Sequence, residues 1–217
     1  MSYDIDMNGN KEEFIKIYKR YIKREGAGEL LAWIEKSDFF EAPASTKYHL
    51  NVPGGLCEHS LNVFYRLRAF LENEYLADHD SECPYDNETI ALVSLLHDIC
   101  KVYHFTINWR NQKNYDQEKV SNSPKYLVKH DADGDFIWDK MPYYDIDERF
   151  IYGHGEKSVY LIREFVKLTP EEAQAIRFHM GSWNKEEARN AGDVYAQSVL
   201  ALYLHFADEA ATFIDEA

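Results

Sequence analysis

The chain has 217 residues, of which 45% are hydrophobic and 29% are charged, a composition typical of a folded globular protein. Its 38 Asp and Glu residues outnumber its 24 Lys and Arg residues, so the net charge is −14 with His counted as neutral. This charge excludes a broad basic surface for duplex nucleic acid or for an anionic membrane. It still allows a small phosphorylated substrate, because bound metal ions reverse the local field.

Cysteine usage and the absence of apolar runs indicate where the protein works. The three cysteines, Cys57, Cys83 and Cys100, are an odd number without Cys-x-x-Cys spacing, which favours reduced thiols. The first residues lack the pattern of a signal peptide, and no run of about 18 apolar residues predicts a membrane span. We therefore expect a cytoplasmic protein without a membrane partner. Its length favours a single domain over 1–217.

The first half of the chain is predicted to be helical. Apolar residues at helical spacing predict two helices in 11–36, within an N-terminal unit of 1–45. A long helix is predicted from Leu56 to Tyr75 and an apolar one over Ile90–Leu96, capped by one of two neighbouring residues, Asp86 or Asn87. These two helices belong to the first half of a core, over 46–101.

A change of pattern predicts a β insertion over 102–153. Apolar and polar residues alternate over Tyr103–Arg110, which is the period of a strand. Lys125–Val128 and Asp135–Trp138 are predicted as further short strands, with a turn at Asp133-Gly134.

Helices resume in the second half of the core, over 154–217. A helix is predicted over Ser158–Phe165, and Thr169 followed by proline and two glutamates predicts the start of another. A last long helix is predicted from Asp193 to Phe213. The expected fold is thus mainly α, a helical bundle interrupted by a small β-hairpin.

Histidines and aspartates at the ends of these elements are the candidate functional residues. His97 and Asp98 close an apolar helix, where a charge needs a partner or a metal, and Lys101 follows one turn later. His205 and Asp208 lie three residues apart in the last helix, so His205 is either a residue that orients the Asp208 carboxylate or a core histidine. Further histidines stand at a helix start, a strand-to-helix junction and a helix end: His59, His154 and His179.

Imidazole and carboxylate groups are the ligands of divalent metals. Two metals a few ångströms apart share a bridging carboxylate and activate one water. We expect one or two divalent ions at this site, with Mn, Fe, Mg, Co, Ni and Zn all open.

Three strings in chain order resemble the HD superfamily of metal-dependent phosphohydrolases, which is named for its His-Asp pair. They are Gly54–Ser60 (GGLCEHS), Leu95–Lys101 (LLHDICK) and Ala207-Asp208. The resemblance covers about Tyr48 to Thr212. The first string is similar to HD domains of bacterial 3′→5′ exoribonucleases, and Gly153–Val159 (GHGEKSV) resembles small HD proteins of bacteria and phages.

The resemblance implies roles for individual residues. It implies a helical HD-type bundle in which His59, His97, Asp98 and Asp208 hold the first metal. It also implies that His154 and His179 complete a second metal site bridged by Asp98, although Phe178 stands where related chains often carry another His. Lys101 matches a lysine that contacts phosphate, and His49 resembles a histidine on the substrate side.

The expected function is a metal-dependent phosphohydrolase, a phosphodiesterase or phosphatase that acts on a nucleotide or on a single-stranded oligonucleotide end through metal-activated water. Asp98 and Lys101 are the expected catalytic residues. Two alternatives stay open: a di-iron oxygenase of the same fold, and a non-catalytic sensor that binds a nucleotide through its metal.

Other polar and aromatic residues have a functional and a structural interpretation. Glu156 and Lys157 either bind substrate near a helix start or form a solvated pair in its first turn. Arg110 and Lys113 are candidate phosphate contacts. Six aromatic residues either stack on a base or pack within the insertion: Tyr103, Trp109, Trp138, Tyr143, Tyr144 and Tyr152. Three histidines are expected at the surface or in strands: His79, His104 and His130.

Overall fold

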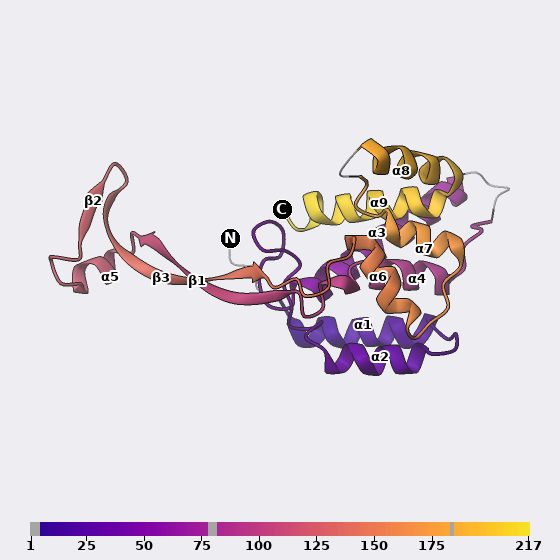
Figure 1. Ribbon diagram of the computed structural model, residues 1–217, viewed down its shortest axis with the longest axis horizontal. Coiled ribbons are helices and arrows are strands. Elements are labelled where there is room, and N and C mark those ends of the chain that lie inside the picture. Colours follow the sequence, from indigo (N-terminus) through magenta and orange to yellow (C-terminus); the bar gives the residue numbers. More distant parts are fainter. Residues whose placement is uncertain (1–4, 78–81, 183–184) are drawn as a thin grey trace.

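A computed structural model describes residues 5–77, 82–182 and 185–217. The expectations for the first four residues and for His79 lie outside these ranges. In the described chain, nine α-helices form a bundle from which a three-stranded antiparallel sheet projects as a long arm (Figure 1). The predicted mainly α-helical bundle with a β insertion is therefore confirmed. None of the described helices has the length and apolar character needed to cross a bilayer.

The N-terminal helices form a hairpin along one side of the bundle (Figure 1). The helix α1 (Met7–Tyr21) is capped by the Asp6 side chain, which accepts a backbone N–H of the first turn. Before α2 (Ala27–Lys36), Gly26 adopts a φ of 85°, and a Cβ there would lie 1.8 Å from the carbonyl oxygen of Phe165. The turn therefore requires glycine, and the two predicted helices are confirmed.

Three helices form the centre of the bundle. The long helix α3 (Gly55–Ala77) packs against both α4 (Asn87–Leu96) and α9 (Val199–Ala210). Every residue of α4 from Ile90 onward is buried, which explains its unbroken apolar sequence. Of the two candidate caps for α4, Asp86 is the one used, because its side chain accepts the backbone N–H of the third helical residue at 2.7 Å.

Two shorter helices complete the core after the insertion. The helix α7 (Pro170–Arg177) begins as predicted, since Thr169 and Glu172 form a reciprocal capping box. The helix α6 (His154–Arg163) begins earlier than predicted, directly after Gly153. Its second residue, Gly155, lies so close to the backbone of α7 that a Cβ would be 2.2 Å from a carbonyl oxygen. This close contact brings the start of α6 beside the end of α7.

The predicted single helix over Asp193–Phe213 is wrong. The chain instead forms α8 (Lys185–Gln197) and α9, separated by Ser198, and ends in a π-helical turn, η2 (Ala211–Asp215). Ser198 adopts an extended conformation, and its hydroxyl accepts a backbone N–H of α9. Because a serine at this position caps a new helix, the apolar pattern continues while the helix axis does not.

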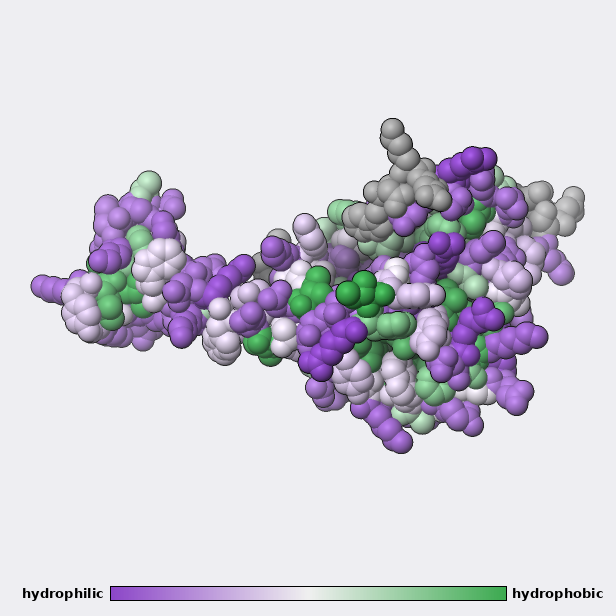
Figure 2. Space-filling view, viewed as in Figure 1, coloured by the Kyte–Doolittle hydropathy of each residue, from purple (hydrophilic) through white to green (hydrophobic). Residues whose placement is uncertain are grey.

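The arm is a two-stranded ribbon with a small cluster at its far end. The strand β1 (Phe105–Asn114) pairs antiparallel with β3 (Gly134–Ile146), from Phe105 opposite Ile146 to Asn114 opposite Ile137. The short strand β2 (Lys129–Asp131) pairs with the start of β3, after the turn at Asp133-Gly134, so the sheet order is β1-β3-β2. We call residues 115–138 the head; Figure 2 shows it as a mass separated from the bundle by the narrow ribbon.

The head differs from the prediction in one segment. Lys125–Val128 is not a strand: residues 125–127 form a turn, and β2 begins at Lys129. A short helix, α5 (Gln117–Asn122), precedes this turn and is capped by Asp116. Val120 of α5 and Phe136 of β3 are buried together in the head. The helix is too short to give a clear helical period in the sequence.

Candidate metal centre

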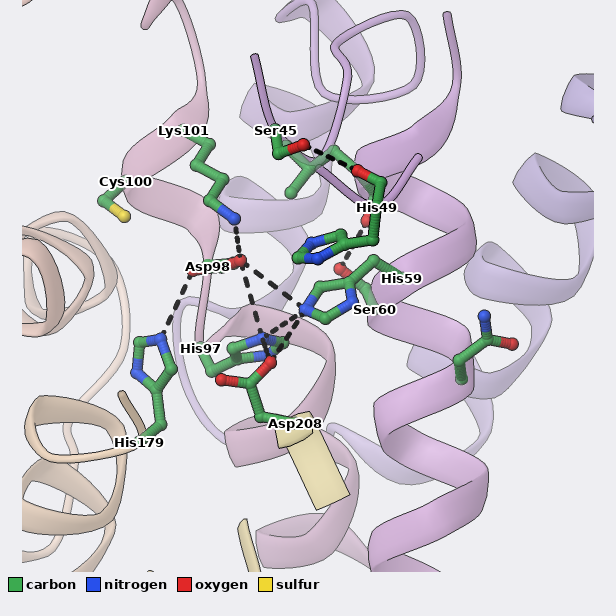
Figure 3. A network of polar contacts seen from close by, with 12 residues as sticks. Ser45, His49, His59, Ser60, His97, Asp98, Cys100, Lys101, His179 and Asp208 are labelled. Atoms are coloured by element: carbon green, nitrogen blue, oxygen red, sulfur yellow. Dashed lines mark hydrogen bonds and ion pairs between the residues drawn. The ribbon is translucent and has the colours of Figure 1, made fainter. Parts of the chain in front are cut away.

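Five helices bring six titratable side chains to one buried place, and Figure 3 shows all of them except His154. Most of these side chains lie at helix ends, where the chain can turn them into the core. All are buried except His154, whose side chain is 34% exposed. In chain order they come from α3, the end of α4, the start of α6, the end of α7 and the last turn of α9: His59, His97, Asp98, His154, His179 and Asp208.

Three of the histidines are fixed in the same way. The Nδ1 of His97 lies 2.7 Å from the carbonyl oxygen of Ser94, and the Nδ1 of His179 lies 2.6 Å from that of Ile176. The Nδ1 of His59 instead lies 3.1 Å from a carboxylate oxygen of Glu216. With Nδ1–H donating outward, the Nε2 of each ring faces the centre, which is how metal-binding histidines are oriented.

Asp98 divides the centre into two halves (Figure 3). Its Oδ2 lies 3.7 Å from the Nε2 atoms of both His59 and His97. Its Oδ1 lies 2.7 Å from the Nε2 of His154 and 3.3 Å from that of His179. One carboxylate therefore faces a different pair of imidazoles with each oxygen. Asp98 thus offers one oxygen to each half of the centre.

Asp208 completes the half that contains His59 and His97. Its Oδ1 lies 3.1 Å from the Nε2 of His59 and 4.0 Å from that of His97. The two Nε2 atoms of these histidines are only 3.2 Å apart. The Nε2 of His179, on the other side of Asp98, makes no hydrogen bond to the described residues. Buried nitrogen atoms that face one another or lack partners fit a metal, because each lone pair then gains a ligand bond.

The electrostatics of the centre show how strongly it favours positive charge. Burial opposes protonation of His59, yet the carboxylates of Asp208 and Glu216 outweigh it and raise the pKa of His59 to about 10. Burial lowers the pKa of His97 to about 3. Burial alone would raise the pKa of Asp98, but the nearby Lys101 ammonium holds it well below its usual range. The carboxylates are thus ionised inside the protein, where a cation stabilises them.

Lys101 and His49 lie at the rim of the centre. The Nζ of Lys101 is 2.5 Å from the Oδ2 of Asp98, and its side chain is 13% exposed. The ring of His49 stacks on that of His59, with centroids 4.9 Å apart. Neither ring nitrogen of His49 has a hydrogen-bond partner among the described residues, and burial lowers its pKa to about 4. His49 is therefore a neutral imidazole that has a free donor and a free acceptor beside the centre.

Other candidate residues lie apart from the six. The Lys157 ammonium is 2.9 Å from Glu148, at the base of the arm, and Glu156 pairs with Arg177 at 2.7 Å. The Nδ1 of His205 lies 2.7 Å from the carbonyl oxygen of His179, so His205 supports the chain after α7 rather than the Asp208 carboxylate. The geometry leaves substrate binding by Glu156 and Lys157 a prediction.

The remaining predicted histidines also lie away from the centre. His104 is half-buried beside Glu148, with its Nδ1 3.0 Å from that carboxylate, and His130 is exposed in the head, beside Asp135. His104 therefore lies at the base of the arm and His130 lies in the head. Both had been expected at the surface or in strands.

Two residues near the centre had no role in the sequence prediction. Glu216 is buried. Its carboxylate accepts a hydrogen bond from the Nδ1 of His59 at 3.1 Å and another from the side-chain amide of Asn62 at 2.9 Å. Cys100 is buried with its Sγ 3.4 Å from the Nδ1 of His154. Cys100 could have been noticed from the sequence, because it occupies the variable position of the LLHDICK string. No local sequence pattern marks Glu216.

A helical bundle that gathers buried His and Asp groupings able to hold metal defines the class as a helical domain with a candidate metal centre. A family model described as HD domain matches residues 56–212, which is well over half of the chain. The chain therefore belongs to the HD domain family, whose members generally are metal-dependent phosphohydrolases that bind divalent ions. No curated protein and no solved structure gives a significant match to the chain.

Proposed function

We propose that this HD domain is a phosphodiesterase or phosphatase that acts on a nucleotide or on the end of a single-stranded oligonucleotide. One observation carries the proposal. The two oxygens of Asp98 face separate pairs of histidines, and the ammonium of Lys101 lies 2.5 Å from one of them at the rim. A fixed positive charge beside groups that could hold two metals supports the proposal, because it would suit a phosphoryl group.

The donor set supports two metal positions that share Asp98. We assign His59, His97 and Asp208 to the first position, and His154 and His179 to the second. Each position combines imidazole nitrogen with carboxylate oxygen. This mixed donor set suits Mn, Fe, Co, Ni or Zn better than a donor set of oxygen atoms alone would suit these metals. The greater exposure of His154 puts the open side of the centre at the second position.

The residues of the chain would hold the substrate as follows. A bound divalent metal supplies Lewis acidity towards a phosphoryl oxygen and lowers the pKa of water at the site. Burial opposes the charge on Lys101, but Asp98 raises its pKa, so the ammonium stays charged and stabilises negative charge developing on the phosphoryl oxygens. The neutral ring of His49, whose buried nitrogen atoms have no hydrogen-bond partner among the described residues, would donate an N–H to a substrate oxygen that enters the centre.

The test is turnover by purified protein loaded with Mn²⁺, Mg²⁺, Fe²⁺ or Co²⁺, measured on a panel of nucleotides and generic phosphodiesters. We expect Asp98→Ala to reduce kcat/KM at least about a hundredfold, since it removes the group shared by both metal positions. The matched control is Asp193→Ala, an exposed aspartate of α8 that should keep full activity. Full activity in Asp98→Ala, or no turnover by the loaded wild-type protein, would contradict the proposal.

The same experiments separate the two alternatives. Oxygen consumption with Fe²⁺ and an organic substrate, without phosphate release, would identify an oxygenase. Tight nucleotide binding without turnover by any metal form would identify a sensor. The position of Lys101 favours hydrolysis, because an ammonium at the rim matches the charge of a phosphoryl group.

A further inference from the structure

We propose that a pocket at the base of the arm binds the part of a nucleotide substrate that lies beyond the reacting phosphate. The aromatic side chain of Tyr143, beside Arg110, would hold a base, and the cations of Lys47 and Arg110 would hold a further phosphate group. The proposal rests on the proposed function, because it names the substrate features that the same protein would recognise.

The pocket lies between the loop over 46–53 and the part of the ribbon nearest the helical bundle. Its volume is about 670 Å³, within the range of pockets that bind small molecules. On the ribbon side, its lining comes from Ile107 and Arg110 of β1 and from residues 142–144 of β3. Ile107 lies directly opposite Tyr144, so the two strands form a continuous wall.

The charge of the pocket is opposite to that of the protein. The chain carries 38 acidic residues, yet the pocket lining includes Lys47 and Arg110 and no Asp or Glu. Neighbouring cavities in the described chain are acidic: one that shares Pro53, Ile107 and Tyr144 with the pocket also contains Asp38 and Glu41. A cavity on the arm itself contains three carboxylates, from Asp116, Glu118 and Asp139. The pocket is therefore a local site for an anion on an acidic molecule.

The two cations of the pocket are available to a ligand. Among the described residues, neither Lys47 nor Arg110 has a carboxylate within ion-pair distance, and both side chains are exposed. The other candidate phosphate contact in the arm, Lys113, pairs with Asp131 in the head. The structure thus separates Arg110 from Lys113, although both lie on β1.

The aromatic residues of the pocket are already oriented. The guanidinium of Arg110 lies 5.2 Å from the centre of the Tyr143 ring, and the Tyr144 ring packs edge-on against Phe105. The hydroxyl of Tyr143 donates to Asp145 at 3.4 Å, and Asp145 is not among the residues that line the pocket. A ring beside a cation is the combination that binds a base and its phosphate, through stacking and charge.

The pocket is joined to the metal centre by one loop. Lys47 lines the pocket, and His49, two residues later, stacks on His59. Two residues span at most about 7 Å of chain, so the backbone of Lys47 lies within that distance of the backbone of His49. A substrate with its reacting phosphate at Lys101 and Asp98 would place its next groups towards the base of the arm.

The test is binding of α,β-methylene-ADP, whose P–C–P bridge resists hydrolysis, to the metal-loaded full chain by calorimetry. We expect the double variant Lys47→Gln/Arg110→Gln to bind at least about tenfold more weakly, because it loses two charge-assisted contacts. Tyr143→Ala should weaken binding severalfold for this nucleotide but not for methylenediphosphonate, which has no base. The matched control is Lys125→Gln, which removes one exposed charge in the head.

The outcomes separate this proposal from the proposed function. Equal affinities of the double variant and the wild type, or an equal loss in Lys125→Gln, would overturn the pocket assignment, as would no binding by the wild type. Binding that depends on the pocket in a protein that hydrolyses nothing would contradict the proposed function and support the pocket. Hydrolysis without pocket-dependent binding would do the reverse.

Discussion

At the scale of single residues, Glu216 determines the orientation of one side of the metal centre. Its carboxylate lies 3.1 and 3.2 Å from the Nδ1 of His59, and Asn62 donates to it as well. A carboxylate in this position fixes the tautomer of a metal-binding histidine and makes the other nitrogen a better ligand. Glu216 is thus a positioning residue that supports His59.

We expect Glu216→Ala to weaken metal binding about 10- to 100-fold, since the His59 ring loses its outer hydrogen bond. Glu216→Gln should lose less, because its amide oxygen still accepts that bond. Metal titration by calorimetry measures both. The control is Asp215→Asn, whose carboxylate binds Arg66 on the neighbouring turn, with its Oδ2 2.7 Å from the Nε of that arginine. Unchanged affinity in Glu216→Ala would contradict this role.

The predictability of the centre from sequence differs between these residues. His97 and Asp98 could be identified because an imidazole and a carboxylate stand side by side at the end of an apolar helix. Burying these polar groups is costly unless a metal or a partner side chain binds them. Glu216 could not, because it lies 157 residues from His59 and no local period links the two. Contacts between distant segments depend on the fold, so only the structure reveals them.

At the scale of elements, an ion pair links the start of α7 to the turn between α1 and α2. The guanidinium of Arg24 binds both oxygens of Glu172 at 2.9 Å, and Glu172 also caps α7. Burial alone would raise the pKa of Glu172, but Arg24 and the capping contacts hold it below its ordinary value. A carboxylate with a lowered pKa stabilises the fold above its unfolded pKa of about 4.3, and that contribution is lost as the pH falls through the folded value.

We therefore expect Glu172→Gln to lower the free energy of unfolding at pH 7 by about 2–3 kcal/mol, since a buried charge loses its partner. The variant should also lose less stability than the wild type when the pH falls below about 4. Urea unfolding at the two pH values measures this. The exposed Glu164, changed to Gln, is the control and should stay within about 0.5 kcal/mol. Parallel acid profiles of wild type and Glu172→Gln would contradict the assignment.

Elements were predictable where their ends carry chemical signals. Thr169, Pro170 and Glu172 mark the start of α7 in the sequence itself. The break at Ser198 was missed, because the apolar period continues across it and the serine gives only a weak signal of its own. In the head, Lys129–Asp131 pairs with β3 across the turn at 132–133, but periodicity alone does not show that the strand begins at Lys129 instead of at Lys125.

At the scale of the whole molecule, the arm is attached to the bundle by two adjacent chain segments. The backbone N–H of Asp147 donates to the carbonyl oxygen of His104 at 2.9 Å, and the strands between them are mostly exposed. The head contains its own small core around Val120 and Phe136. The bundle and its metal centre should therefore fold without the arm.

We expect a chain in which Asn-Gly replaces 106–145 to fold and to bind metal as the full chain does. The two-residue turn joins Phe105 to Ile146, which already face each other across the ribbon. Its Tm should change by no more than about 2–4 °C, equivalent to about 1 kcal/mol. Binding of α,β-methylene-ADP should be lost. Calorimetry and thermal melting measure these properties, and loss of metal binding would show that the arm supports the centre.

The arm also makes the molecule an electric dipole. Residues 105–146 contain six Lys and Arg and seven Asp and Glu, so the rest of the chain carries −13 of the total charge of −14. The bundle repels an approaching anion, and the arm repels it far less. The arm extends well beyond the bundle (Figure 1). Polyanions should therefore reach the molecule from the side of the arm, and their association rate should rise with ionic strength because salt screens the repulsion by the bundle.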